Sequence, residues 1–155
     1  MEVITNKEEF IKRSTDYFKQ GLNCAECVMQ TYLDTGESNL DPTVMALVSG
    51  FGGGIGKTSH NTCGALLGAC VALGELKGRQ NPFALETPKE RIMELNGEIY
   101  PNFATLSNRF EEVFTTTICH EMCKGYIDHE GVERKRNCKK AIAVAAEILA
   151  DFIYE

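Results

Sequence analysis

The hydrophobic pattern of this chain is that of an all-helical protein. Apolar residues recur every three to four positions, and no segment shows convincing strand-like alternation. Capping residues and prolines mark the expected helix starts near Asn6, Asn23, Asp41, Thr62 and Thr87. A short segment then holds Cys119 to Cys123, and the last helix is expected from about Glu133. Pro101 either kinks the fifth segment or starts a further helix. The prediction is one all-α domain, residues 1–155, folded as a bundle of about six or seven helices.

Composition narrows the class of partner. The chain has 155 residues, of which 43% are hydrophobic, and its net charge is −6, so we expect an ordinary globular core. No arm or face is densely basic, so no nucleic-acid partner is expected. The one basic stretch, Arg134 to Lys140, opens a predicted helix and is interpreted as a solvated face.

The interpretation of the cysteines depends on the compartment in which the protein is expected. No apolar run approaches the ~18–20 residues that span a bilayer, and the first residues lack an apolar signal segment. We therefore expect no membrane association and a cytoplasmic location, where thiols are kept reduced. Seven cysteines in such a compartment suggest metal or redox chemistry before structural disulfides, and their odd number argues against a fully paired framework.

Four cysteines are predicted to share one site. Cys24, Cys63 and Cys138 each lie on the apolar stripe of a different predicted helix, and Cys119 lies on a fourth, short segment. Thiols that point inward from separate helices meet in a bundle core, where sites are commonly built from one ligand per helix. Their spacing differs from the paired CxxC motifs of a zinc ribbon.

Cys63 is the candidate reactive thiol. It is expected in the first turn of a helix, where free N–H groups and the positive end of the helix dipole favour a thiolate. Two histidines near the predicted site, His60 and His120, are weaker candidates for direct metal ligands. The remaining cysteines are interpreted as mainly structural, with a role as ligand or resolving thiol left open: Cys27, Cys70 and Cys123.

A glycine-rich stretch, Gly50 to Gly56, precedes Cys63. It does not match a phosphate loop, because Phe51 stands where that pattern needs its first glycine and no strand precedes it. We interpret these glycines as letting the backbone turn sharply and pass close to a cofactor or another helix, with N–H groups directed to cluster sulfurs or an anion. Gly64 and Gly68 likewise indicate close helix approach. The candidate cofactor-binding glycines are Gly53, Gly54, Gly56 and Gly64.

The segment Cys63-Gly64-Ala65-Leu66-Leu67-Gly68 carries a CGAxxG motif and resembles the C_GCAxxG_C_C family of bacterial and archaeal redox-active proteins. The resemblance covers roughly Phe18 to Ala150. The other matching segments are Gly21-Leu22-Asn23-Cys24-Ala25, Gly52-Gly53-Gly54-Ile55-Gly56, Cys119-His120-Glu121-Met122 with Gly125 after it, and Cys138 before Ala141-Ile142-Ala143. The resemblance maps the four family cysteines onto Cys24, Cys63, Cys119 and Cys138, the same four indicated by the helix faces.

The resemblance implies redox involvement. The family is also similar to part of the split-Soret cytochromes c, in which a comparable cysteine set is associated with an iron–sulfur centre. Covalent haem is not expected, because Cys24-Ala25-Glu26-Cys27 is followed by Val28 and not by a histidine.

Three functions stay open, and an electron carrier and an oxidoreductase are both among them. In the first, the four cysteines hold an iron–sulfur cluster, most simply [2Fe–2S], for electron transfer or redox sensing. In the second, a metal-free thiol–disulfide oxidoreductase, Cys63 attacks and Cys24 or Cys119 resolves the mixed disulfide. In the third, a structural four-cysteine zinc domain mediates protein contacts. The redox partner is not identified by the sequence, and a homodimer is a modest expectation.

Overall fold

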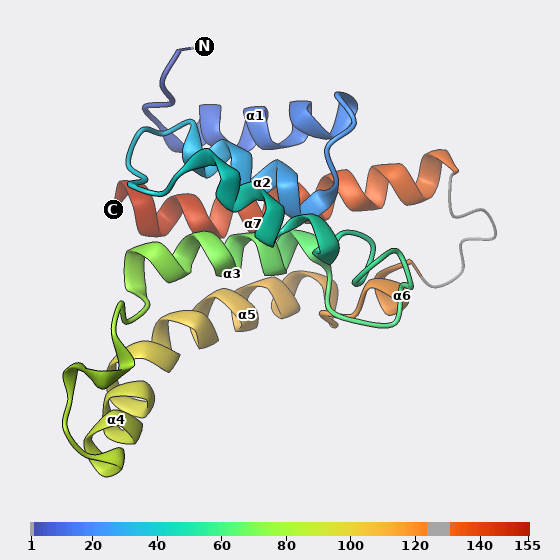
Figure 1. Ribbon diagram of the computed structural model, residues 1–155. Coiled ribbons are helices and arrows are strands. Elements are labelled where there is room, and N and C mark those ends of the chain that lie inside the picture. The colour runs from blue at the N-terminus through green and yellow to red at the C-terminus, as the bar shows by residue number, and fades with distance from the viewer. Residues whose placement is uncertain (1, 124–130) are drawn as a thin grey trace.

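The structure, a computed structural model, describes residues 2–123 and 131–155, and most of these residues are helical (Figure 1). The α-helices are α1 (Lys7–Lys19), α2 (Cys24–Leu33), α3 (Gly64–Lys77), α4 (Pro88–Glu94), α5 (Tyr100–Phe114), α6 (Cys119–Met122) and α7 (Val132–Tyr154). Short 3₁₀ helices cover Pro42–Leu47, Ser49–Phe51 and Pro82–Ala84. The predicted all-α bundle is confirmed.

Local capping explains where several helices begin. The side chain of Asn6 accepts a hydrogen bond from the backbone N–H of Glu9 at 2.9 Å, which satisfies one of the N–H groups that a helix start leaves without a partner. Asn23 and Glu26 form a reciprocal capping box at the start of α2. Thr87 caps α4 and is followed by a proline. These predicted starts are confirmed.

Two segments differ in detail from the prediction. The apolar stretch after Asp41 forms a 3₁₀ helix, Pro42–Leu47, and not an α-helix. A π-helical turn, Leu95–Ile99, joins α4 to α5 immediately before Pro101, which lies in the first turn of α5. Because proline has no N–H to donate, the ordinary helical bonding cannot continue through it, and the widened turn absorbs the interruption. Gly125, expected near the end of the short cysteine segment, lies outside the described residues.

The core lies between α2, α3 and α7, with α1 packed on α2 and α7 and α5 packed on α3 and α7 (Figure 1). The largest fully buried side chains include Tyr32, Phe10, Phe110, Met29 and Leu73. Four alanines of α7 are buried inside this bundle: Ala141, Ala145, Ala146 and Ala150. A β-carbon added to Gly68 would lie 2.5 Å from the carbonyl oxygen of Ala25, so α2 and α3 are in backbone contact. The close helix approach predicted at Gly68 is present.

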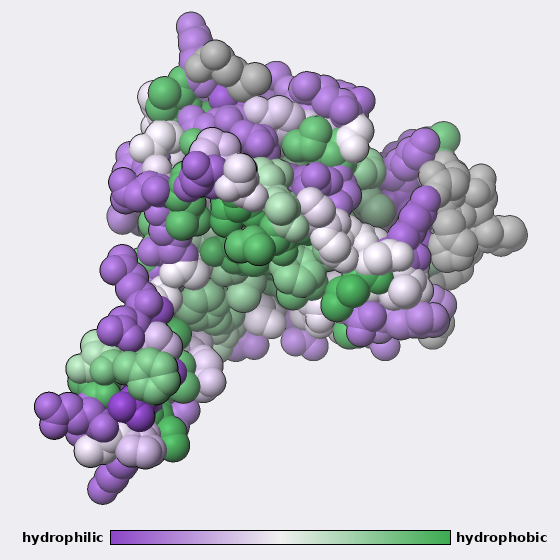
Figure 2. Space-filling model, viewed as in Figure 1, coloured by the Kyte–Doolittle hydropathy of each residue, from purple (hydrophilic) through white to green (hydrophobic). Residues whose placement is uncertain are grey.

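The direction of the helices creates a polar end of the bundle. In Figure 1, α2, α3 and α7 run in the same direction, so their N-termini lie at the same end. At the opposite end, the unit formed by Pro82–Ala84 and α4 projects from the bundle, with Phe83, Ile92 and Met93 exposed (Figures 1 and 2). Within the described residues, no helix has the length and apolar character needed to cross a bilayer.

Candidate functional site: a cysteine-lined cavity

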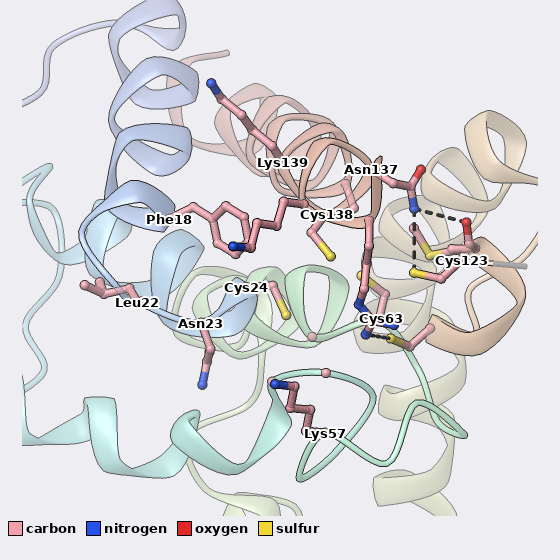
Figure 3. Close-up of a pocket in the computed structure, with 18 of the residues that line it drawn as sticks. Phe18, Leu22, Asn23, Cys24, Lys57, Cys63, Cys123, Asn137, Cys138 and Lys139 are labelled. Atoms are coloured by element: carbon pink, nitrogen blue, oxygen red, sulfur yellow. Dashed lines mark hydrogen bonds between the residues drawn. The ribbon is translucent and has the colours of Figure 1, made fainter. Parts of the chain in front are cut away.

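A cavity of about 980 Å³ opens at the end of the bundle where the three N-termini meet. Figure 3 shows the sulfur atoms of Cys24, Cys63 and Cys138 turned toward the same space. The cysteines that line the cavity are Cys24, Cys63, Cys119, Cys123 and Cys138, and all of them are free thiols. The structure therefore brings the four predicted site cysteines together and adds Cys123 to them.

Helix starts position the thiols of α2 and α7. Cys24 is the first residue of α2, held beside the cavity by the capping box described above. Cys138 lies in the second turn of α7, one helical turn after Arg134. Both thiols are partly buried and line the cavity, and Cys24 also packs against the edge of the apolar core.

Backbone hydrogen bonds hold Cys63 and Cys119 on neighbouring segments. The N–H of Cys63 donates to the carbonyl of Thr117 at 2.7 Å, and the N–H of Cys119 donates to the carbonyl of Asn61 at 2.9 Å. The two bonds flank an isolated antiparallel bridge between residues 62 and 118. Two thiols that are far apart in the sequence are thereby fixed on one wall of the cavity.

Cys63 is the N-cap of α3 and not a residue of its first turn, which corrects the sequence-based placement. Hydrogen bonds from the backbone of Ala65 and Leu66 favour its thiolate, as the sequence suggested. Burial nevertheless outweighs them, and together with the nearby Cys24 it raises the pKa of the Cys63 thiol above its ordinary value. Burial likewise raises the pKa of Cys138 to about 12.

Two glycines allow the backbone to reach the thiols. A β-carbon added to Gly64 would lie 2.4 Å from the sulfur atom of Cys24, and one added to Gly54 would lie 2.8 Å from the β-carbon of Cys119. Gly53 and Gly56 line the cavity. A β-carbon added to Gly53 would lie 2.8 Å from Cα of Lys57 in its own loop, and one added to Gly56 would meet nothing within 4 Å. Close approach therefore occurs at Gly54 and Gly64, where it sets the position of a thiol.

The loop before Cys63 is a left-handed turn. Every residue from Gly53 to Lys57 has a positive φ, including Ile55 at 66° and Lys57 at 61°. A β-branched residue in this region is a backbone outlier, and such strain is found preferentially at functional sites. The turn directs Lys57 toward the cavity (Figure 3).

The cavity is lined by cations. Arg134 is only 6% exposed, and its Nη2 donates to Cys119 Sγ at 3.7 Å. The cationic lining residues are Lys19, Lys57, Arg134, Lys135, Arg136 and Lys139, and the lining described contains no aspartate or glutamate. The interpretation of residues 134–140 as a solvated face was therefore wrong for Arg134, which the fold buries against the thiols.

Several other candidates lie away from the cavity. Cys27 and Cys70 are not among the residues that line it. His60 and His120 are exposed, with ring centres 6.3 Å apart, and neither of them lines it. Sequence reasoning undervalued Cys123, for which a signal existed: it follows Cys119 by four residues, the spacing that places both on one face of a helical turn.

The thiols share a cavity without converging on a single point. Among residues 2–123 and 131–155, no group of three or more histidine, cysteine, aspartate or glutamate side chains is arranged to hold one metal ion. The cations and helix N-termini around the thiols favour negative charge at this place, such as that of thiolates.

Fold and site together define an all-helical protein with a cysteine-lined, cationic cavity. The chain belongs to the family described as "Putative redox-active protein (C_GCAxxG_C_C)", whose model matches residues 22–152. The family resemblance noted in the sequence is thus confirmed. No curated protein and no solved structure matches the chain.

Proposed function

We propose that this protein holds an iron–sulfur cluster in its cavity, ligated by Cys24, Cys63, Cys119 and Cys138, and that it acts in electron transfer or redox sensing. The observation that carries the proposal is the set of thiols, drawn from four separate segments of the chain, that line one cavity. Cysteine thiolates are the ligands that such clusters use. Membership in a family described as redox-active supports the same chemistry.

The charge of the cavity fits this group. A [2Fe–2S] unit bound by four thiolates is an anion, and its surroundings must compensate that charge. Arg134 donates to Cys119, and the N-termini of α2, α3 and α7 supply partial positive charge. When bound, the cluster supplies one-electron redox chemistry. The residues of the chain would hold the cluster, limit the access of water to it and set its redox potential through hydrogen bonds and burial.

A metal-free thiol–disulfide oxidoreductase is the second candidate. It is favoured by the hydrogen bonds that hold the segments of Cys63 and Cys119 together. In that reaction, a substrate disulfide accepts two electrons and two protons, and the two cysteines form a disulfide in exchange. Burial disfavours this candidate, because a buried thiol with a raised pKa ionises poorly and is a weak nucleophile.

The test is purification without air, followed by a visible spectrum and by iron, acid-labile sulfide and zinc analysis of one sample. Iron and sulfide in equal amounts, with visible absorbance bands, are the expected result. A colourless protein that also fails cluster reconstitution would contradict the proposal. If that protein lost two hydrogens per disulfide on oxidation, with no metal bound, the second candidate would replace the first.

A further inference from the structure

The cavity is larger than a small cluster requires. Its volume of about 980 Å³ lies near the top of the range, roughly 300–1,000 Å³, in which proteins bind small organic molecules. A [2Fe–2S] core contains only four atoms. In Figure 3, Phe18, Leu22 and Lys139 lie on the side of the cavity away from Cys63 and Cys123. Cys24 and Cys138 lie between the two sides, and a four-atom cluster held by the thiols leaves room beside Phe18 and Leu22.

The charged residues described on the cavity wall are all cationic. Six lysines and arginines line it, whereas the described lining contains no carboxylate, although the chain as a whole has a net charge of −6. A concave surface lined by one sign of charge focuses the electrostatic potential and concentrates ligands of the opposite sign. The cavity therefore attracts an anion even though the molecule is acidic.

Several of these cations lie near the N-terminus of α7, where positive charge is unfavourable. Arg134, Lys135 and Arg136 lie in the first two turns of the helix, where the macrodipole favours acidic residues and disfavours cations. Lys139 follows Lys135 by four residues, so the two share one face of the helix, and both line the cavity. An anion held at this helix start would remove the repulsion.

We propose that the side of the cavity formed by Phe18, Leu22, Lys135 and Lys139 binds a small organic anion bearing phosphate or carboxylate groups. Its oxyanions would contact the lysines, and its apolar part would contact Phe18 and Leu22. The concave shape selects a small molecule over the flat surface of an acidic protein. This inference goes beyond the proposed function and does not depend on it, because the charges and the cavity belong to the protein itself.

Isothermal titration calorimetry at low ionic strength tests the inference, with pyrophosphate, citrate and poly-glutamate as separate probes. The variant K135Q/K139Q removes two lining charges at nearly constant side-chain length. K140Q is the matched control, because Lys140 adjoins Lys139 but lies over the ring of Phe114, outside this cavity. The expected result is saturable binding of pyrophosphate or citrate that weakens with added salt, roughly ten-fold or more weaker in K135Q/K139Q and unchanged in K140Q.

The outcomes separate the ligand sources and the two proposals. Binding of pyrophosphate alone identifies a phosphate ligand, and binding of citrate alone identifies a carboxylate ligand. Either result supports the inference. Binding of poly-glutamate without either small anion overturns it in favour of an acidic protein partner, and equal loss in K140Q or absence of all binding also overturns it. Iron and sulfide are measured on the same samples. A protein that binds the anion but never a cluster would defeat the proposed function alone.

Discussion

The backbone of α3 lies directly against the thiol at the start of α2: a β-carbon added to Gly64 would lie 2.4 Å from Cys24 Sγ and 2.7 Å from the carbonyl oxygen of Phe51. The oxygen belongs to the backbone and cannot swing away. Glycine at residue 64 is therefore required by the position of its neighbours, in spite of its low helix propensity.

Replacement of Gly64 by alanine is expected to destabilise the fold by about 1–3 kcal/mol, because the added methyl group forces α3 away from Cys24. Gly74→Ala is the matched control in the same helix, since a β-carbon there meets nothing within 4 Å. The control should gain roughly 0.5–1 kcal/mol from improved helix propensity. Urea denaturation measures both. Equal stabilisation by the two substitutions would show that α3 does not contact Cys24 in this way.

The left-handed turn gives an unusual prediction for an exposed apolar residue. Ile55 has a φ of 66° and is 44% exposed, so its side chain adds strain and buries little surface. Ile55→Gly should raise the free energy of unfolding by about 1 kcal/mol, because glycine adopts this conformation without a steric penalty. Ile92→Gly, at an exposed site inside α4, should instead lower it by a similar amount. Loss of stability in both variants would contradict the strained turn.

The buried thiol of Cys27 predicts a loss of stability at alkaline pH. Burial raises its pKa from 9.0 to about 12, so in that interval the unfolded chain loses a proton that the folded chain keeps. The stabilisation is complete below pH 9 and is lost as the pH rises toward 12. Between pH 7 and pH 10, wild-type protein should lose about 1.4 kcal/mol more than Cys27→Ala does. Urea denaturation over this pH range measures both proteins, and the same pH dependence of stability in wild type and Cys27→Ala would refute the prediction.

Arg134 is expected to set the redox potential of the proposed centre. Its guanidinium is buried and donates to Cys119 Sγ, so it favours the state with one more electron. Arg134→Gln should lower the potential by on the order of tens of millivolts, whereas Arg134→Lys retains the charge and should lower it less. A spectroscopic redox titration measures the three proteins. An equal shift in both variants would point to packing and not to charge.

Local sequence signals predicted much of the fold. The caps at Asn6, Asn23 and Thr87 act on N–H groups within three residues, so their effect does not depend on the rest of the chain. The cavity also groups the four cysteines indicated by the sequence. Apolar spacing placed Cys24, Cys63 and Cys138 on inward helix faces, and the family resemblance supported these three together with Cys119.

Tertiary placement decided what the sequence left hidden. The pKa of Cys63 depends on how completely neighbouring segments bury it, and burial reversed the effect expected from the helix start. Arg134 appears in the sequence as one of several surface cations, and only the cavity between α2, α3 and α7 turns it inward. The left-handed turn at Ile55 has no propensity signal, because a β-branched residue ordinarily avoids it.

The most direct test of the cysteine-lined centre compares two serine variants of one helix region. Cys63, the N-cap of α3, lines the cavity, whereas Cys70 lies within α3 and does not. After reconstitution without air, wild-type protein and Cys70→Ser should contain iron and sulfide and show visible absorbance that dithionite bleaches reversibly. Cys63→Ser, with a far-ultraviolet circular dichroism spectrum like that of wild type, should lack all three. Full iron, sulfide and reversible bleaching in Cys63→Ser, or a wild-type protein that stays colourless, would contradict the account.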